Sequence, residues 1–116
     1  MATKILDLNN VERSVMDLTF MDEARTTLTL KIPTEDLVNE LENMGPELAK
    51  MKTGDRDAVD LIYGLAARLI SCNRDFVEVT AAELRDKKKY RMDLESLLIF
   101  VSNYMDFISS IANQKN

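Results

Sequence analysis

Apolar and polar residues alternate along the first third of the chain. Within residues 14–20 apolar and polar positions alternate from residue 16 onward, which is the period of a half-buried strand, and Val15 blurs the polar face slightly. The apolar face holds Met16, Leu18 and Phe20, and Asp17 and Thr19 lie opposite. Residues 27–32 alternate in the same way and are rich in β-branched side chains, as strands are. The polar segment 22–25 joins the two runs, so we expect an antiparallel hairpin, to which Ile5, Leu6 and Leu8 add a short edge strand.

The period changes to that of a helix after Pro33. Thr34 is a good N-cap, and the acidic residues 35 and 36 favour the positive end of a helix. The apolar positions then recur at steps of four and three, at Leu37, Leu41, Met44, Leu48 and Met51. Gly45-Pro46 interrupts this pattern, because proline has no amide hydrogen to donate. The sequence therefore predicts either two short helices or one kinked helix.

Three further helices are predicted in the second half. A break with a new N-cap at residues 53–55 precedes a long apolar stripe over 58–73, which we expect to be the most buried helix. Residues 76–79 are expected to be extended. Thr80 and Glu83 match a capping box for a short polar helix running toward 87–89.

The last predicted helix runs from Leu94 to about residue 113. Asp93 is its expected N-cap, and Met92 and Leu97 are placed to form a hydrophobic staple. The apolar side chains cover about half of its circumference, and Ile99 falls in the polar half. Such a helix either inserts centrally in a bundle or faces another chain.

The order of elements predicts an α+β fold, with an N-terminal β-hairpin or small antiparallel sheet packed against a bundle of about four helices. The chain has 116 residues, enough for one domain with its own core. We expect a single domain over 1–116, β-rich in 1–32 and helical in 33–116.

The composition argues against several kinds of chemistry. The chain has no histidine and a single cysteine, so it lacks Ser-His-Asp and Cys-His catalysis and most zinc sites. Its net charge of −5 is unfavourable for binding nucleic acid. Charged residues interrupt every apolar window of about 18 residues, so no membrane segment is predicted. We expect a cytoplasmic, non-enzymatic protein with no cofactor and no metal.

Four local features have a functional and a structural interpretation. Residues 55–60 resemble a calcium loop but lack its glycine and its final glutamate. Cys72 is expected to pack in a helix stripe rather than to react. The basic run 85–91 suits an acidic partner or RNA, but a solvated helix end explains it more simply. Glycines occur only at 45, 54 and 64, too far apart for a phosphate loop.

Four segments resemble a known family. They are Ile5–Asn9, Pro33–Val38, Ala66–Arg74 and Met92–Leu97. They look like small proteins of prophages and siphophage-like tailed phages of Gram-positive bacteria, the tail assembly chaperones encoded just before the tape measure protein. The resemblance lies in packing and capping residues and includes no catalytic signature. It implies a non-enzymatic chaperone in the host cytoplasm, acting in virion morphogenesis.

The same resemblance implies the partners. They are the long helical tape measure protein and the tail tube protein that polymerises around it, with a homo-oligomer as a further option. The residues that we expect to contact the tape measure protein are Phe100, Tyr104, Phe107 and Ile111. The alternatives are another phage morphogenetic or adaptor protein and, less favoured, a small regulator. An enzyme is the least favoured class.

Overall fold

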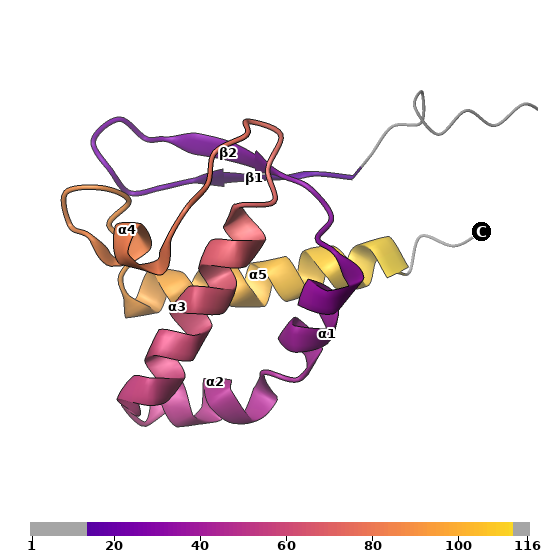
Figure 1. Ribbon diagram of the computed structural model, residues 1–116, viewed down its shortest axis with the longest axis vertical. Coiled ribbons are helices and arrows are strands. Elements are labelled where there is room, and N and C mark those ends of the chain that lie inside the picture. Colours follow the sequence, from indigo (N-terminus) through magenta and orange to yellow (C-terminus); the bar gives the residue numbers. More distant parts are fainter. Residues whose placement is uncertain (1–13, 113–116) are drawn as a thin grey trace, which may run out of the picture.

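Two antiparallel strands and five helices make up residues 14–112, which are the residues that this computed structural model describes. The elements are β1 (Met16–Thr19), β2 (Thr27–Leu30), α1 (Glu35–Glu42), α2 (Gly45–Lys52), α3 (Arg56–Ile70), α4 (Ala81–Arg85) and α5 (Leu94–Ala112). The predicted α+β class is therefore confirmed. The sheet lies over α3 and α5, which cross one another, and α2 lies at the opposite end of the molecule (Figure 1).

The hairpin has the predicted alternation but is shorter than expected. Leu18 pairs with Leu28, and Met16 with Leu30. Phe20 lies just beyond β1 and is buried, so its place on the apolar face is kept. The predicted edge strand at residues 5–8 lies outside the described residues.

The helix boundaries follow the predicted caps. The Asp55 side chain accepts a hydrogen bond from the Ala58 amide at 3.1 Å, and α3 begins at Arg56, two residues before the predicted stripe. The Asp93 carboxylate accepts one from the Ser96 amide at 2.8 Å at the start of α5. The capping box of Thr80 and Glu83 is present in full. These bonds join residues three apart, which is why sequence patterns could predict them.

The interruption at Gly45-Pro46 produces two helices, α1 and α2. Pro46 lies in the first turn of α2, where a missing amide hydrogen costs little because no carbonyl is placed to accept it. Before α3, Gly54 has a φ of +91°, a backbone conformation that other residues rarely adopt. The predicted break at residues 53–55 is thus a turn that needs its glycine.

Helix α3 is the centre of the core. Nine of its residues are buried, and it packs against α1, α2, α4, α5 and β2. It ends at Ile70 rather than at Asn73, and residues 76–79, expected to be extended, belong to no strand and begin with Phe76 at a φ of +58°.

Asn73 explains both differences. Its buried side chain donates to the carbonyls of Ile70 and Val77 at 2.8 and 2.7 Å and accepts from the amides of Asp75 and Val77 at 3.0 Å. The side chain takes the place of helical backbone partners, which ends α3 and folds the following residues into a tight loop.

Candidate functional site

The four predicted contact residues have different environments in α5. Phe100 and Tyr104 are buried in the core, whereas Phe107 and Ile111 are partly exposed. The three aromatic rings pack in sequence along α5. The ring centroids of Phe100 and Tyr104 are 5.5 Å apart, and those of Tyr104 and Phe107 are 5.7 Å apart. Burial raises the pKa of the Tyr104 hydroxyl above its ordinary value. Phe100 and Tyr104 are therefore packed in the core, although the Phe100 ring also lines the groove described next.

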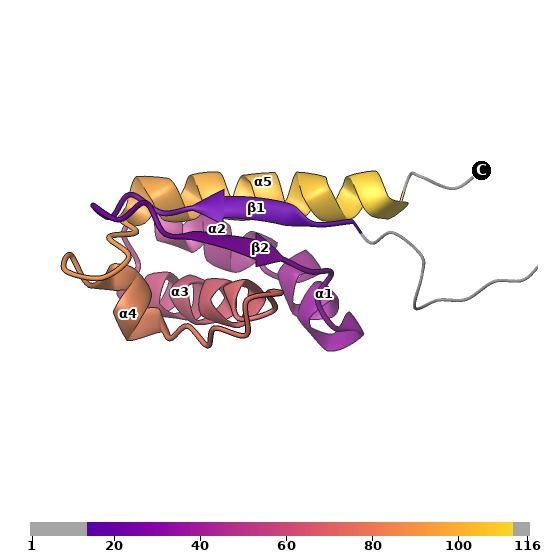
Figure 2. The same cartoon turned by 90° about the horizontal axis from the view of Figure 1, so that it is seen from above.

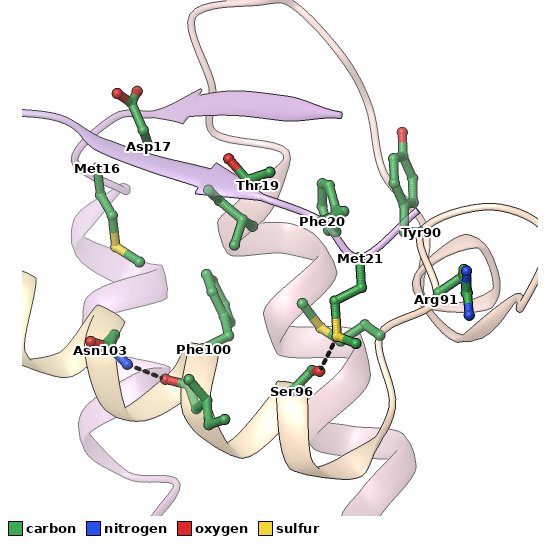
Figure 3. A pocket seen from close by; sticks show the side chains of 13 residues that line it. Met16, Asp17, Thr19, Phe20, Met21, Tyr90, Arg91, Ser96, Phe100 and Asn103 are labelled. Atoms are coloured by element: carbon green, nitrogen blue, oxygen red, sulfur yellow. Dashed lines mark hydrogen bonds between the residues drawn. The ribbon is translucent and has the colours of Figure 1, made fainter. Parts of the chain in front are cut away.

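An apolar groove lies between β1 and the first half of α5. Its volume is about 430 Å³. Figure 3 shows the side chains that line it. Its apolar lining includes Met16, Leu18, Met21, Met92, Ile99 and Phe100. We call it the β1–α5 groove. Its volume falls within the range of about 300–1,000 Å³ typical of sites that enclose a ligand.

The alternation of β1 and the helical period of α5 together build the groove. Met16 in β1 points toward α5, and Phe100 points from α5 toward the strand (Figure 3). At one end the Ser96 hydroxyl donates a hydrogen bond of 3.3 Å to the Met21 sulfur. Nearby, the rings of Phe20 and Tyr90 pack with centroids 4.4 Å apart. The groove therefore depends on two parts of the chain that are distant in sequence, residues 16–21 and 90–103.

The lining includes two strongly exposed apolar side chains. Met21 is 62% exposed and Ile99 is 54% exposed. The sequence singled out Ile99, because it is the apolar residue in the polar half of the helix. It did not predict which residues lie near the Ile99 side chain. Methionine is flexible and polarisable, so a lining of this kind adapts to differently shaped apolar side chains.

The groove has little polar chemistry. One carboxylate, Asp17, and one guanidinium, Arg91, are in its lining. The Asp17 carboxylate accepts a hydrogen bond of 2.9 Å from the Thr29 hydroxyl on β2. Among residues 14–112, no group of three or more cysteine or acidic side chains is placed to hold a metal ion. What this arrangement can do chemically is to bind apolar side chains.

Carboxyl groups with shifted pKa values lie at caps and ion pairs. Hydrogen bonds from Arg68 lower the pKa of Glu40, and those from Thr80 lower the pKa of Glu83. Hydrogen bonds from Thr26 likewise lower the pKa of Asp22, and hydrogen bonds from Ser96 lower the pKa of Asp93. A general acid needs its pKa raised instead. These four carboxyl groups have structural roles.

Two of the five cationic residues in the basic run 85–91 pair with acidic side chains of the described protein. Arg85 pairs with Asp60 at 2.6 Å and lies 4.6 Å from the centre of the Tyr63 ring. Lys89 pairs with Glu83 at 3.4 Å. Helix α4 ends at Arg85, so the rest of the run forms turns rather than the predicted helix end. Cys72 is a half-buried free thiol beyond the end of α3.

Helix α5 is long and apolar enough to cross a membrane, judged by length and composition alone. The segment Leu94–Ile111 has a mean hydropathy of 1.2. It also contains Glu95 and Asp106, and 22% of its residues are buried within the protein. The helix is thus more hydrophobic than expected for a helix of which so small a share is buried.

Comparisons with known proteins identify no relative of this chain. No protein-family model, curated protein or solved structure matches it.

Proposed function

We propose that this protein is a non-enzymatic tail assembly chaperone that binds the tape measure protein through the β1–α5 groove. Two observations support the proposal. The sequence resembles such chaperones in four segments, and the structure has an apolar groove with little polar chemistry. The groove is the observation that carries the proposal, because a chaperone has to cover apolar side chains of its client.

The shape and composition of the groove suit a helical client. An amphipathic helix binds in a groove through apolar residues spaced three and four apart, which together form a narrow stripe. Ile99 and Met21 would contact such a stripe at little cost in solvation, because both are already exposed to water. The net charge of −5 would keep the complex in solution.

The proposal is tested by co-expression with the tape measure protein and affinity purification. The variant is Ile99→Glu, which places a charge at the groove. The matched control is Leu61→Glu on α3, since Leu61 is 52% exposed and Ile99 54%. We expect Ile99→Glu to reduce the recovered tape measure protein about tenfold or more, as expected when a charge is buried in an apolar contact. Leu61→Glu should recover as much as the unchanged chain.

Two results would refute the proposal. One is full recovery of the tape measure protein with Ile99→Glu. The other is an equal loss with Leu61→Glu, which would indicate nonspecific capture through exposed apolar residues. Circular dichroism of each variant shows whether it is folded before recovery is compared.

A further inference from the structure

The basic run 85–91 forms a closed turn between α4 and α5. The Arg91 amide donates a hydrogen bond of 3.0 Å to the Asp86 carbonyl. The Met92 amide donates one of 2.8 Å to the Leu84 carbonyl. Arg91 has a φ of +58°, in the left-handed region that residues with a β-carbon rarely adopt. These bonds fold the run back on itself, so its lysines lie beyond the last turn of α4.

The turn is anchored to the hairpin. Tyr90 is buried, and the centre of its ring lies 4.4 Å from that of Phe20, just beyond β1. Seen from above, the segment that joins α4 to α5 lies at the same end of the molecule as the tip of the hairpin (Figure 2). The backbone of Arg91, the next residue, is therefore held beside the hairpin. A charge presented by an ordered backbone loses less entropy on binding than one on a mobile loop.

Part of the turn lines a hollow of about 360 Å³, which we call the basic hollow. Its lining includes Lys87 and Arg91, which are exposed and form no ion pair within the described part of the chain. Arg85, which pairs with Asp60, and one carboxylate, Asp93, complete its charged lining. Lys87 and Arg91 outnumber this carboxylate, so the hollow is positively charged although the whole chain has a net charge of −5.

The basic hollow adjoins one end of the β1–α5 groove. The two share three lining residues, Met21, Arg91 and Met92. Figure 3 shows Arg91 beyond Met21, at the end of the groove opposite to Met16. The carboxylate in the groove lining belongs to Asp17, which follows Met16 in β1 and points away from α5 (Figure 3). The two ends of the groove therefore differ in charge.

We propose that the client of the β1–α5 groove is a helix with acidic side chains beside one end of its apolar stripe, and that this end binds at Lys87 and Arg91. The inference rests on the proposed function, since it concerns the client of the same groove. The groove holds the apolar stripe, and the two cations pair with the acidic side chains. Because the basic hollow adjoins one end of the groove, the charges also fix the direction in which the helix lies.

The arrangement of charge favours carboxylates of a protein over a nucleic acid. A nucleic acid presents a continuous row of phosphates and needs clustered cations along it, which the net charge of −5 disfavours. Here two cations lie at the end of an apolar groove, and this pattern matches an amphipathic helix with acidic residues at one end. An exposed ion pair adds little to affinity. The charges therefore select among clients, and the apolar contacts supply most of the binding free energy.

Binding of two synthetic peptides to the full-length chain, measured by fluorescence anisotropy, tests the proposal. Both peptides are amphipathic helices with the same stripe of leucines. They differ only beside one end of the stripe, where one has glutamates and the other glutamines. At about 50 mM salt we expect the glutamate peptide to bind about fivefold more tightly or more, as two exposed ion pairs give. The net charge of −5 alone predicts the opposite preference, so this result identifies local cations.

The variant that locates these cations is Lys87→Gln with Arg91→Gln. The matched control is Lys50→Gln with Lys52→Gln on α2, which removes the same charge from exposed residues outside the lining of the groove and the basic hollow. We expect the first variant to reduce the preference for the glutamate peptide to less than about twofold, and the control to keep it. Salt at about 500 mM should also reduce the preference of the unchanged chain, because salt screens exposed charges.

Three results would overturn the inference. They are equal binding of the two peptides to the unchanged chain, a preference that survives Lys87→Gln with Arg91→Gln, and an equal loss of preference in the control. If both peptides bind equally and Ile99→Glu abolishes their binding, the proposed function stands and only this inference fails. If neither peptide binds the unchanged chain, the groove does not bind helices, and the proposed function fails as well.

Discussion

The hydroxyl of Tyr63 donates a hydrogen bond of 2.7 Å to the main-chain carbonyl of Met92. Both residues are buried, and the bond ties the middle of α3 to the segment that enters α5. Desolvation raises the pKa of Tyr63 although the charge of Arg85 acts against this. The position of α5, and with it one wall of the groove, thus depends partly on a single hydroxyl group.

Replacing Tyr63 with Phe is expected to lower the free energy of unfolding by about 1–2 kcal/mol, because the buried Met92 carbonyl loses its partner. Urea denaturation measures the change. The control is Tyr104→Phe, whose hydroxyl lies 3.4 Å from the Lys31 carbonyl and forms a weaker bond. An equal or larger loss for Tyr104→Phe would contradict the expectation.

Asn73→Ala is expected to cost about 3 kcal/mol or more, because it removes four hydrogen bonds from a buried loop. Asn73→Asp should also destabilise, since a carboxylate cannot donate to the Ile70 and Val77 carbonyls. Asn103→Ala is the control. Its exposed side chain makes one bond, to the Ile99 carbonyl in its own helix. Thermal unfolding that is unaffected by Asn73→Ala would rule out this role.

Phe76→Gly is expected to stabilise the protein by about 1 kcal/mol. Phe76 has a φ of +58° and is 94% exposed, so it has backbone strain and almost no packing to lose. Phe76→Ala keeps a β-carbon and therefore the strain, and should leave stability nearly unchanged. If both variants have the same midpoint of urea unfolding, the strain does not exist.

Phe100→Ala should cost about 3–5 kcal/mol, the usual range for truncating a buried aromatic side chain. Phe107→Ala should cost clearly less, because this ring is partly exposed. Chemical denaturation separates the two cases. Equal, small losses for the two variants would contradict a core packing role for Phe100.

Acid should destabilise the protein through its capping carboxylates. Hydrogen bonds from Thr26 lower the pKa of Asp22, and those from Ser96 lower the pKa of Asp93, relative to the ordinary value of 3.8. The unfolded chain therefore binds protons first as the pH falls, and stability is lost as the pH drops from about 4 through the folded pKa values. We expect the free energy of unfolding, measured between pH 6 and 2, to fall less steeply in Asp22→Asn. An unchanged slope would exclude Asp22 as a contributor.

Local patterns predicted most of the elements. The caps at Thr34, Asp55, Thr80 and Asp93 are all present. Residues 77 and 79 belong to no strand for a physical reason, since their backbone partners are the side chains of Asn73 and Ser71 and not a neighbouring strand. Asparagine at a helix end is common, and nothing in the sequence shows that this one is buried.

The candidate site was predicted only in part. The apolar excess of the last helix was evident, but Phe100 and Tyr104 proved to be core residues, and Met21 was not a candidate. Helical periodicity shows which residues share a face of α5, but it does not show where the hairpin covers that face. Ile99 was the residue that pointed to the groove, because it is an apolar residue in the otherwise polar half of the helix.

The sequence by itself determined the helix and strand segments, their caps and the acidic, histidine-free composition. These depend on backbone conformation and on bonds between residues a few positions apart, or on composition alone. Only the tertiary structure decided that β1 approaches α5, that Met21 and Ile99 line one groove, and that the loop after α3 pairs the edge of β2. Those relationships join residues as much as 78 positions apart, from Met21 to Ile99. They form only when burial of the shared core brings the segments together.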